Sequence, residues 1–268
     1  MALKSVGKKA RSGGAEGTDL AGRVVLVTGA GIRVGRAIAL ELGQAGARVA
    51  VHYARSAAGA RGTVRAIESA RGAGAARAFA ADLSTPSNAA GLVADVVRWA
   101  GRLDVLVCSA AAFDRRPFEE IDERAWRDMM ALNLEAPFRL AQAAAPHLRR
   151  ARPDGVIVNI LDVAAFHAWK GYAHYSTAKA GLAMLTRILA LELAPRVRVA
   201  AVAPGTVAFP DDYPAADRER IVARIPLGRV GAPADVARAV HYLCTADYVT
   251  GSVVTVDGGR MAGTLGRL

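Results

Sequence analysis

The sequence predicts an α/β fold: a single Rossmann-type, doubly wound domain with a seven-stranded, mostly parallel sheet and helices on both faces. Three observations lead to this prediction. Short β-branched runs alternate with longer helical patterns along the 268 residues. A glycine-rich turn follows the first run, and no second domain or tandem repeat is visible. Strands that alternate with helices form βαβ units with right-handed crossovers, which makes the strands parallel.

The expected strands are apolar, β-branched runs of strand length. In chain order they are Arg23–Thr28, Ala47–Tyr53, Ala76–Ala81, Leu103–Ser109, Gly155–Ile160, Val197–Ala203 and Ser252–Val256. Between them lie stretches with helical periodicity, several of which begin at a polar residue or a proline. These expected helices are Arg33–Ala45, Ala57–Arg71, Ser87–Ala100, Glu123–Arg149, His174–Leu193 and Pro233–Ala246.

One long irregular stretch follows the sixth expected strand. Residues 204 to about 214 contain three prolines and two aspartates, and a short helical pattern comes next at Ala215–Arg224. A loop at the carboxyl end of a parallel strand is a common place for residues that close over a substrate. We therefore predict a substrate lid here.

Composition excludes several classes of protein. Residues 1–20 are rich in Gly, Ser and Lys and lack an apolar signal core, so we expect a flexible basic tail before a domain at residues 21–268. No apolar run approaches the ~18 residues of a membrane span. The two cysteines, Cys108 and Cys244, fall in an expected strand and helix, which favours free thiols and a cytoplasmic location.

The net charge of +11 is spread along the chain. Because no stripe of basic and aromatic residues accompanies it, we expect no nucleic-acid partner and a positive field that favours anionic cofactors and substrates. The five histidines show no metal-ligand spacing, and no metal is predicted.

A glycine-rich turn connects the first strand to the first helix. It reads Thr28-Gly29-Ala-Gly31-Ile-Arg33-Val34-Gly35. Glycines at such a turn let the backbone approach a pyrophosphate, and the helix N-terminus supplies N–H donors. We predict a dinucleotide cofactor bound at this turn.

The end of the second strand indicates which dinucleotide binds. NAD-selective sites place an acidic residue there, whereas this chain has Tyr53-Ala-Arg55-Ser56. An arginine accommodates a 2′-phosphate, so the sequence favours NADPH. The alternative is a solvated arginine at the start of a loop.

Tyr175 and Lys179 lie four residues apart in an expected helix and therefore share a face. An ammonium near a phenol favours the phenolate, so we expect the pKa of Tyr175 to fall below its ordinary value of about 10. A tyrosine tuned in this way exchanges a proton at working pH. Without a charged partner, Tyr175 would be an ordinary residue of an amphipathic helix.

The turn, Asn133 and Tyr175-x-x-x-Lys179 together resemble the short-chain dehydrogenase/reductase family. The resemblance covers residues 23 to 259 and includes Asp82-Leu83, Pro204-Gly205 and the terminal Val256-Asp-Gly-Gly259. It implies a homotetramer and adds Asn133 to the catalytic group, where it holds a water linked to Lys179. The cofactor contacts it implies are Gly29, Arg33, Val34, Gly35, Tyr53, Arg55, Ser56, Asp82, Leu83, Ser109, Ala110, Tyr175, Lys179, Pro204 and Gly205.

Three details look like the pteridine reductase branch of that family. Arg33 stands where most relatives carry glycine, His52-Tyr53-x-Arg55-Ser56 ends the second strand, and Asp162 replaces the usual serine thirteen residues before Tyr175. Residues 211–214 also resemble the substrate loop of that branch. Phe113 matches the aromatic residue that stacks on the pterin ring. The resemblance implies substrate contacts from Arg33, Phe113, Asp162 and Tyr175, although an isolated aromatic after a strand is as often packed in the core.

An aspartate at position 162 offers different hydrogen-bond chemistry from the serine that the family usually has there. A serine hydroxyl donates a hydrogen bond to a ketone oxygen, whereas a carboxylate accepts strongly from N–H groups, which a pterin ring carries. Asp162 therefore orients such a ring or fixes Tyr175; the structural alternative is a partly exposed aspartate paired with a nearby cation. Trp169 and Tyr172 line the same region or pack the loop.

Two departures from the family pattern bear on affinity. Cys108-Ser109 stands where the family usually has two asparagines, and Ala111 stands where the pteridine branch has serine. Side-chain hydrogen bonds from those positions are lost.

The favoured function is an NADPH-dependent reductase of a pteridine-type substrate such as dihydrobiopterin, dihydromonapterin or dihydrofolate, with Tyr175 as the proton donor. Two alternatives stay open. One is an NADPH-dependent ketone or 3-oxoacyl reductase, in which Asp162 only positions Tyr175. The other is a non-catalytic NADPH-binding sensor.

Overall fold

The computed structural model describes residues 19–209 and 214–262. The predicted tail at residues 1–20 lies almost wholly outside the described residues, as does most of the 211–214 segment compared with a substrate loop. The boundary of the domain moves by two residues, because Leu20 is fully buried and its N–H donates to Ala45 O at 3.0 Å. Asp19 and Leu20 therefore belong to the folded part of the chain.

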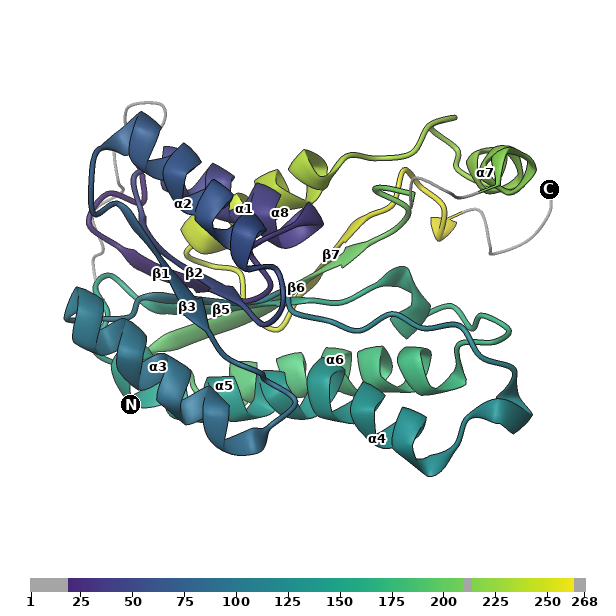
Figure 1. Cartoon of the computed structure of the whole chain (residues 1–268), viewed down its shortest axis with the longest axis horizontal. Helices are drawn as coiled ribbons and strands as arrows, with labels where there is room; N and C mark the ends of the chain where they lie inside the picture. The colour runs from purple at the N-terminus through teal and green to yellow at the C-terminus, as the bar shows by residue number, and fades with distance from the viewer. Residues whose placement is uncertain (1–18, 210–213, 263–268) are drawn as a thin grey trace, which may run out of the picture.

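Seven strands form one sheet, and every neighbouring pair is parallel (Figure 1). The strands are β1 (Val24–Val27), β2 (Arg48–Tyr53), β3 (Ala76–Ala80), β4 (Val105–Cys108), β5 (Gly155–Ile160), β6 (Val197–Pro204) and β7 (Val253–Val256). Their order is β3-β2-β1-β4-β5-β6-β7. The predicted seven-stranded, doubly wound sheet is confirmed, and the strand order reverses between β1 and β4.

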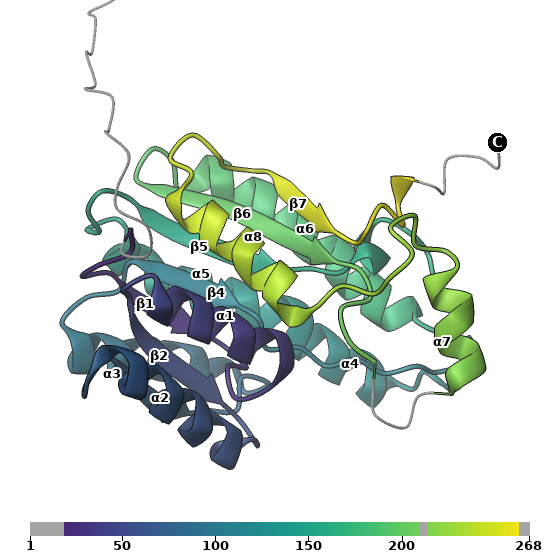
Figure 2. The same cartoon turned by 90° about the horizontal axis from the view of Figure 1, so that it is seen from above.

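Helices cover both faces of the sheet. The covering helices are α1 (Arg33–Gln44), α2 (Ala57–Arg71), α3 (Pro86–Ala100), α4 (Glu123–Met130), α5 (Ala136–Leu148), α6 (Ala173–Glu192) and α8 (Pro233–Thr245). A further helix, α7 (Ala215–Val222), lies beyond the end of the sheet. Two short 3₁₀ turns are η1 (Phe118–Glu120) and η3 (Val163–Ala165). In Figure 1, α1, α2 and α8 lie above the sheet and α3 to α6 below it, and Figure 2 shows the upper row from above.

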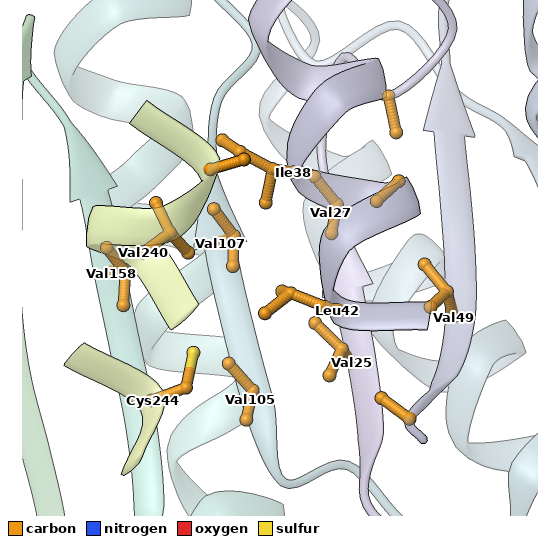
Figure 3. Packing of buried hydrophobic residues seen from close by; sticks show 14 of the residues in the cluster. Val25, Val27, Ile38, Leu42, Val49, Val105, Val107, Val158, Val240 and Cys244 are labelled. Atoms are coloured by element: carbon orange, nitrogen blue, oxygen red, sulfur yellow. The ribbon is translucent and has the colours of Figure 1, made fainter. Parts of the chain in front are cut away.

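The alternation of side chains along each strand divides the core between these two layers. Val25 and Val27 of β1 pack with Ile38 and Leu42 of α1 and with α8, as Figure 3 shows. Val24 and Leu26, which point the other way, pack with α3 and α5. Both faces are buried, and for this reason the central strands are continuous apolar runs.

The predicted helix at Glu123–Arg149 is interrupted. A π-helical turn, η2 (Ala131–Glu135), separates α4 from α5 and contains Asn133. Such a turn inserts an extra residue into a helix and is frequent at functional sites. Helical periodicity does not reveal it, because the pattern continues on both sides of the insertion.

Within the residues the structure describes, no helix combines the length and the apolar character that crossing a bilayer requires.

Candidate active site

The predicted site residues follow strands that end at the same edge of the sheet. Gly29 comes after β1 and Ser109-Ala110 after β4, so they flank the point where the strand order reverses. Open parallel sheets bind their ligands at this point. Asp162 follows β5, and Pro204 closes β6 at the same edge. The fold thus brings the predicted cofactor and catalytic residues together.

The glycine turn is built for close backbone approach. Gly29 has a φ of +66°, and a Cβ there would lie 3.0 Å from Ala110 Cα. A Cβ on Gly35 would lie only 2.3 Å from Gly29 O. Among the residues that the structure describes, no side chain caps the N-terminus of α1, which leaves its first-turn N–H groups able to bind an anion. The turn therefore fits the diphosphate of a dinucleotide.

Arg33 begins α1 with a φ of +49°, in the left-handed region. Glycine adopts this conformation freely, whereas a residue with a Cβ is strained there by about 1–2 kcal/mol. This explains why glycine suits the position and why arginine is unusual. The Arg33 side chain is exposed beside the glycine turn, and Val34 behind it is partly buried.

Thr28 ties the loops after β1 and β4 together. Its Oγ1 accepts hydrogen bonds from the N–H groups of Ser109 and Ala110, both at 2.9 Å. The cysteine and serine that replace the family's asparagines leave this backbone contact in place. Cys108 is buried, and burial raises the pKa of its thiol to about 12, so it is a protonated core residue.

His52 is a residue whose role the sequence did not reveal. It is 1% exposed, its Nδ1 accepts from Gly29 N–H at 3.1 Å, and its Nε2 lies 3.0 Å from Ala81 O. Since Nδ1 accepts, Nε2 carries the proton and donates to Ala81. Burial lowers the pKa of His52. The neutral ring thus fixes the glycine turn against the end of β3. In the sequence, the only sign of this role is a histidine inside the apolar run of β2.

The other predicted cofactor residues surround the same edge. Tyr53 ends β2, Arg55 is exposed, and Ser56 precedes the first residue of α2. After β3, Asp82 accepts from the N–H and hydroxyl of Ser84, which lowers the pKa of its carboxyl, and Leu83 is buried. After β6, Gly205 N–H donates to Val256 O at 2.9 Å.

Asn133 is held firmly at the π-helical turn. Its Nδ2 donates to Ala112 O at 3.1 Å and to Met129 O at 3.2 Å, and the residue is 1% exposed. Its Oδ1 is buried and accepts from no group among the described residues. A buried amide oxygen of this kind requires a donor. Asn133 is thus equipped to bind a polar group, as the family resemblance implies.

Tyr175 and Asp162 form a direct pair. The phenol, 4% exposed near the start of α6, donates to Asp162 Oδ2 at 3.0 Å. Asp162 Oδ1 accepts from Ala164 N–H at 2.8 Å, which fixes the carboxylate at the start of η3. Lys179 is 3% exposed, donates to Ile160 O at 2.9 Å and has its Nζ 5.8 Å from the Tyr175 ring centroid.

These contacts correct the predicted pKa of Tyr175. Burial, followed by the charge and the hydrogen bond of Asp162, holds the pKa of the phenol well above its ordinary value instead of below it. Burial also raises the pKa of Asp162 and lowers that of Lys179 to about 8. Two effects that the sequence spacing does not show raise the pKa of Tyr175. Desolvation penalises the phenolate, and the Asp162 carboxylate accepts the hydrogen bond of the phenol.

Three aromatic residues, Phe113, Trp169 and Tyr172, form a cluster with Tyr175. Phe113 is 61% exposed, stacks on Tyr172 with 5.0 Å between centroids, and meets Tyr175 edge-on at 4.9 Å. Trp169 meets Tyr172 edge-on at 5.7 Å. Phe113 is therefore not a core residue: its ring is largely exposed beside the phenol, with one face against Tyr172, and Trp169 belongs to the same cluster.

A doubly wound sheet with a glycine turn at its reversal point, and a Tyr-x-x-x-Lys pair beside a buried Asn and Asp, defines a nicotinamide-dependent oxidoreductase. The chain belongs to the short-chain dehydrogenase/reductase family: a family model described as enoyl-(acyl carrier protein) reductase matches residues 29–260.

Three relatives illustrate the similarity. The 3beta-hydroxysteroid dehydrogenase 1 of Eggerthella lenta is 38% identical over 90% of this chain and 94% of its own length. A 3-oxoacyl-(acyl-carrier-protein) reductase of Staphylococcus aureus is 36% identical over 87% of this chain and 96% of its own. The crystal structure of a dehydrogenase/reductase from Sinorhizobium meliloti 1021 superimposes with a TM-score of 0.83 at 36% identity, covering 90% of this chain and 96% of that one. These relatives establish the family and not the pteridine branch.

Proposed function

We propose that the protein is an NADPH-dependent reductase of a pteridine-type substrate, such as dihydrobiopterin, dihydromonapterin or dihydrofolate, with Tyr175 as proton donor. One observation carries the proposal: a carboxylate, Asp162, stands at the position of the usual serine and contacts the phenol beside the exposed ring of Phe113. A carboxylate accepts from ring and amino N–H groups, and an aromatic face stacks on a flat heterocycle. A simple aliphatic ketone offers neither feature.

The proton step follows from the state of Tyr175. Its raised pKa keeps the phenol protonated, so it has a proton to give. When bound, a reduced nicotinamide supplies a hydride to the substrate carbon. Tyr175 gives its proton to the adjacent nitrogen or oxygen, Lys179 stabilises the resulting phenolate, and solvent restores the proton. Asn133 Nδ2 ties Met129 O, at the end of α4, to Ala112 O in the loop after β4, and both residues pack with Tyr175.

The preference for NADPH over NADH rests on Arg55 and Ser56 after β2, where no acidic side chain stands. Arg33, exposed beside the glycine turn, adds positive charge near the diphosphate and the substrate. Initial rates with NADPH and with NADH at equal concentrations test this preference. A higher kcat/KM for NADH would contradict it.

The substrate proposal is tested by following NADPH oxidation with two panels. One contains dihydrobiopterin, dihydromonapterin and dihydrofolate; the other contains cyclic ketones and 3-oxoacyl thioesters. We expect turnover of at least one dihydropterin with a kcat/KM above that of every ketone. Turnover confined to the ketones would refute the pteridine proposal and leave the reductase chemistry of Tyr175 intact.

A ketone or 3-oxoacyl reductase is the second candidate. Two observations favour it. The relatives include a hydroxysteroid dehydrogenase and a 3-oxoacyl reductase, and the Asp162–Tyr175 hydrogen bond also suits an aspartate that only positions the phenol. A non-catalytic sensor is disfavoured, since Asn133, Tyr175 and Lys179 are all retained in one buried cluster.

We also propose a homotetramer, as the family resemblance implies. Met184, Ile188 and Leu191 on α6 are 53%, 46% and 83% exposed, and Phe138 on α5 is 39% exposed. A second copy of the chain would cover these apolar side chains. Light scattering of the wild type and of Leu191→Glu tests this. We expect the wild type to be a tetramer and the variant, which carries a charge in the interface, to dissociate at higher protein concentration. A monomeric wild type would contradict the proposal.

A further inference from the structure

Arg260 is a cation close to the candidate active site that has no assigned role. It follows β7, directly after Gly258 and Gly259. Asp257 fixes the backbone around it, since its carboxylate accepts from Gly259 N–H at 2.9 Å and from Met261 N–H at 2.7 Å. Arg260 therefore sits in an ordered turn.

Two contacts, neither of them with a carboxylate, hold the guanidinium in place. Its Nη1 donates to Thr206 Oγ1 at 3.2 Å, and its Cζ lies 5.3 Å from the ring centroid of Trp169. Stacking on an indole face holds an arginine in place and keeps most of its N–H donors available. Arg260 is partly buried and makes no ion pair with a carboxylate among the described residues.

Two connections join Arg260 to the reacting residues. Trp169 contacts Tyr172, which in turn contacts both Phe113 and Tyr175. The charge of Arg260 also acts on Asp162: it lowers the pKa of that carboxyl, against the larger upward effect of burial. Arg260 is thus linked to the Asp162–Tyr175 pair through Trp169 and Tyr172 and through the effect of its charge on Asp162.

We propose that Arg260 is a specificity-determining residue that binds a carboxylate group of the substrate reduced at Tyr175. Arginine pairs with a carboxylate through two parallel N–H donors, which is stronger and more directional than a lysine contact. Asp162 alone would repel an anionic substrate, and Arg260 offsets that repulsion. The site then accepts a substrate with N–H donors in its ring and a carboxylate on its side chain, which describes dihydrofolate better than dihydrobiopterin.

This inference rests on the proposed reduction at Tyr175, but the test separates the two. Steady-state kcat/KM is measured for two pairs that differ in a carboxylate: dihydrofolate against dihydrobiopterin, and acetoacetate against its ethyl ester. The proteins are the wild type, Arg260→Gln, Arg260→Lys and, as a matched control, Arg98→Gln, which removes an exposed arginine of α3. If only the ketone pair turns over, the pteridine proposal fails while Arg260 is still tested.

We expect Arg260→Gln to lower kcat/KM for the carboxylate member of the active pair by about ten- to a hundredfold, mainly through KM, because a charge-assisted hydrogen bond is lost. The neutral member should change less than about twofold. Arg260→Lys should recover part of the loss, and Arg98→Gln should match the wild type. Equal losses for both members would indicate a structural role and overturn the proposal, as would no loss at all.

A binding measurement compares a ligand that carries a carboxylate with one that does not, and it requires no turnover. Quenching of tryptophan fluorescence reports the affinity of the NADP-loaded protein for folate and for biopterin. Arg260→Gln should weaken folate alone. Folate affinity that is unchanged in this variant would refute the role of Arg260 whether or not the protein reduces pterins.

Discussion

Tyr175 gives its hydrogen bond to Asp162 across 3.0 Å, while Lys179, four residues further along α6, donates to Ile160 O instead of to the phenol. The phenol is thus bound to an acceptor and kept protonated. In this state Tyr175 is ready to act as an acid, which is the role that a reduction requires.

Replacing Asp162 by Asn should change the pH dependence of the reaction. The charge of Asp162 raises the pKa values of both Tyr175 and Lys179, so its removal lowers both. A proton donor is lost as the pH rises through its pKa, and we therefore expect the alkaline limb of kcat/KM to move to lower pH. Asp95→Asn, an exposed position on α3, is the control. An unchanged or upward-shifted limb would argue against the pairing.

Tyr175→Phe should lower kcat by about 10²–10⁴-fold, the usual contribution of a general acid. The hydroxyl is lost while the ring and its contacts with Phe113 and Tyr172 stay. NADPH affinity, measured by fluorescence titration, should remain within about twofold of the wild type. Normal turnover in this variant would exclude Tyr175 as the proton donor.

Arg33→Gly should weaken cofactor binding without lowering the stability of the protein. Glycine relieves the strain of a φ of +49°, so the protein without cofactor should unfold at the same temperature as the wild type or a few degrees higher. The loss of a positive charge beside the glycine turn should raise KM for NADPH. Arg36→Gly, inside the first turn of α1, is the contrast, because there glycine only weakens the helix. A KM for NADPH that stays unchanged would remove Arg33 from the cofactor site.

His52 should matter for cofactor binding although it is buried behind the site. His52→Asn keeps an acceptor near Nδ1 for Gly29 N–H, His52→Gln keeps a donor near Nε2 for Ala81 O, and His52→Leu loses both. We expect NADPH affinity to fall most in His52→Leu, since a buried polar group left without its partner costs about 1–3 kcal/mol. Equal affinity in all three variants would contradict this role.

His241 should stabilise the fold at low pH. Its ring lies between Glu41 of α1 at 3.0 Å and Asp19 at 2.9 Å. Burial alone would lower the pKa of His241, but the hydrogen bonds of Asp19 and Glu41 outweigh it and raise the pKa. The stabilisation is therefore complete below the unfolded pKa of about 6.5 and is lost as the pH rises through the higher folded value.

The measurement is urea unfolding of the wild type and His241→Gln between pH 5 and 9. The difference in unfolding free energy should be largest at pH 5, below about 1 kcal/mol for a cluster that is only partly buried, and should vanish at pH 9. His52→Leu is a useful comparison: burial lowers the pKa of His52, so its contribution shrinks as the pH falls below about 6.5. A His241→Gln difference that grows with pH would refute the proposed ion pairs.

The sequence by itself determined the fold class, the family and the residues gathered at the carboxyl edge of the sheet. These follow from short-range patterns: β-branched runs, helical periodicity, a glycine turn and the Tyr175-x-x-x-Lys179 spacing. The sequence did not determine the π-helical turn at Asn133, the bridge that His52 makes to Gly29 and Ala81, or the position of Arg260 on Trp169. The Tyr175-x-x-x-Lys179 spacing predicted a lowered pKa for the phenol, whereas the tertiary structure raises it. Hydrogen bonds between distant segments and the desolvation of buried charges depend on which atoms packing brings within a few ångströms, and only the tertiary structure sets those distances.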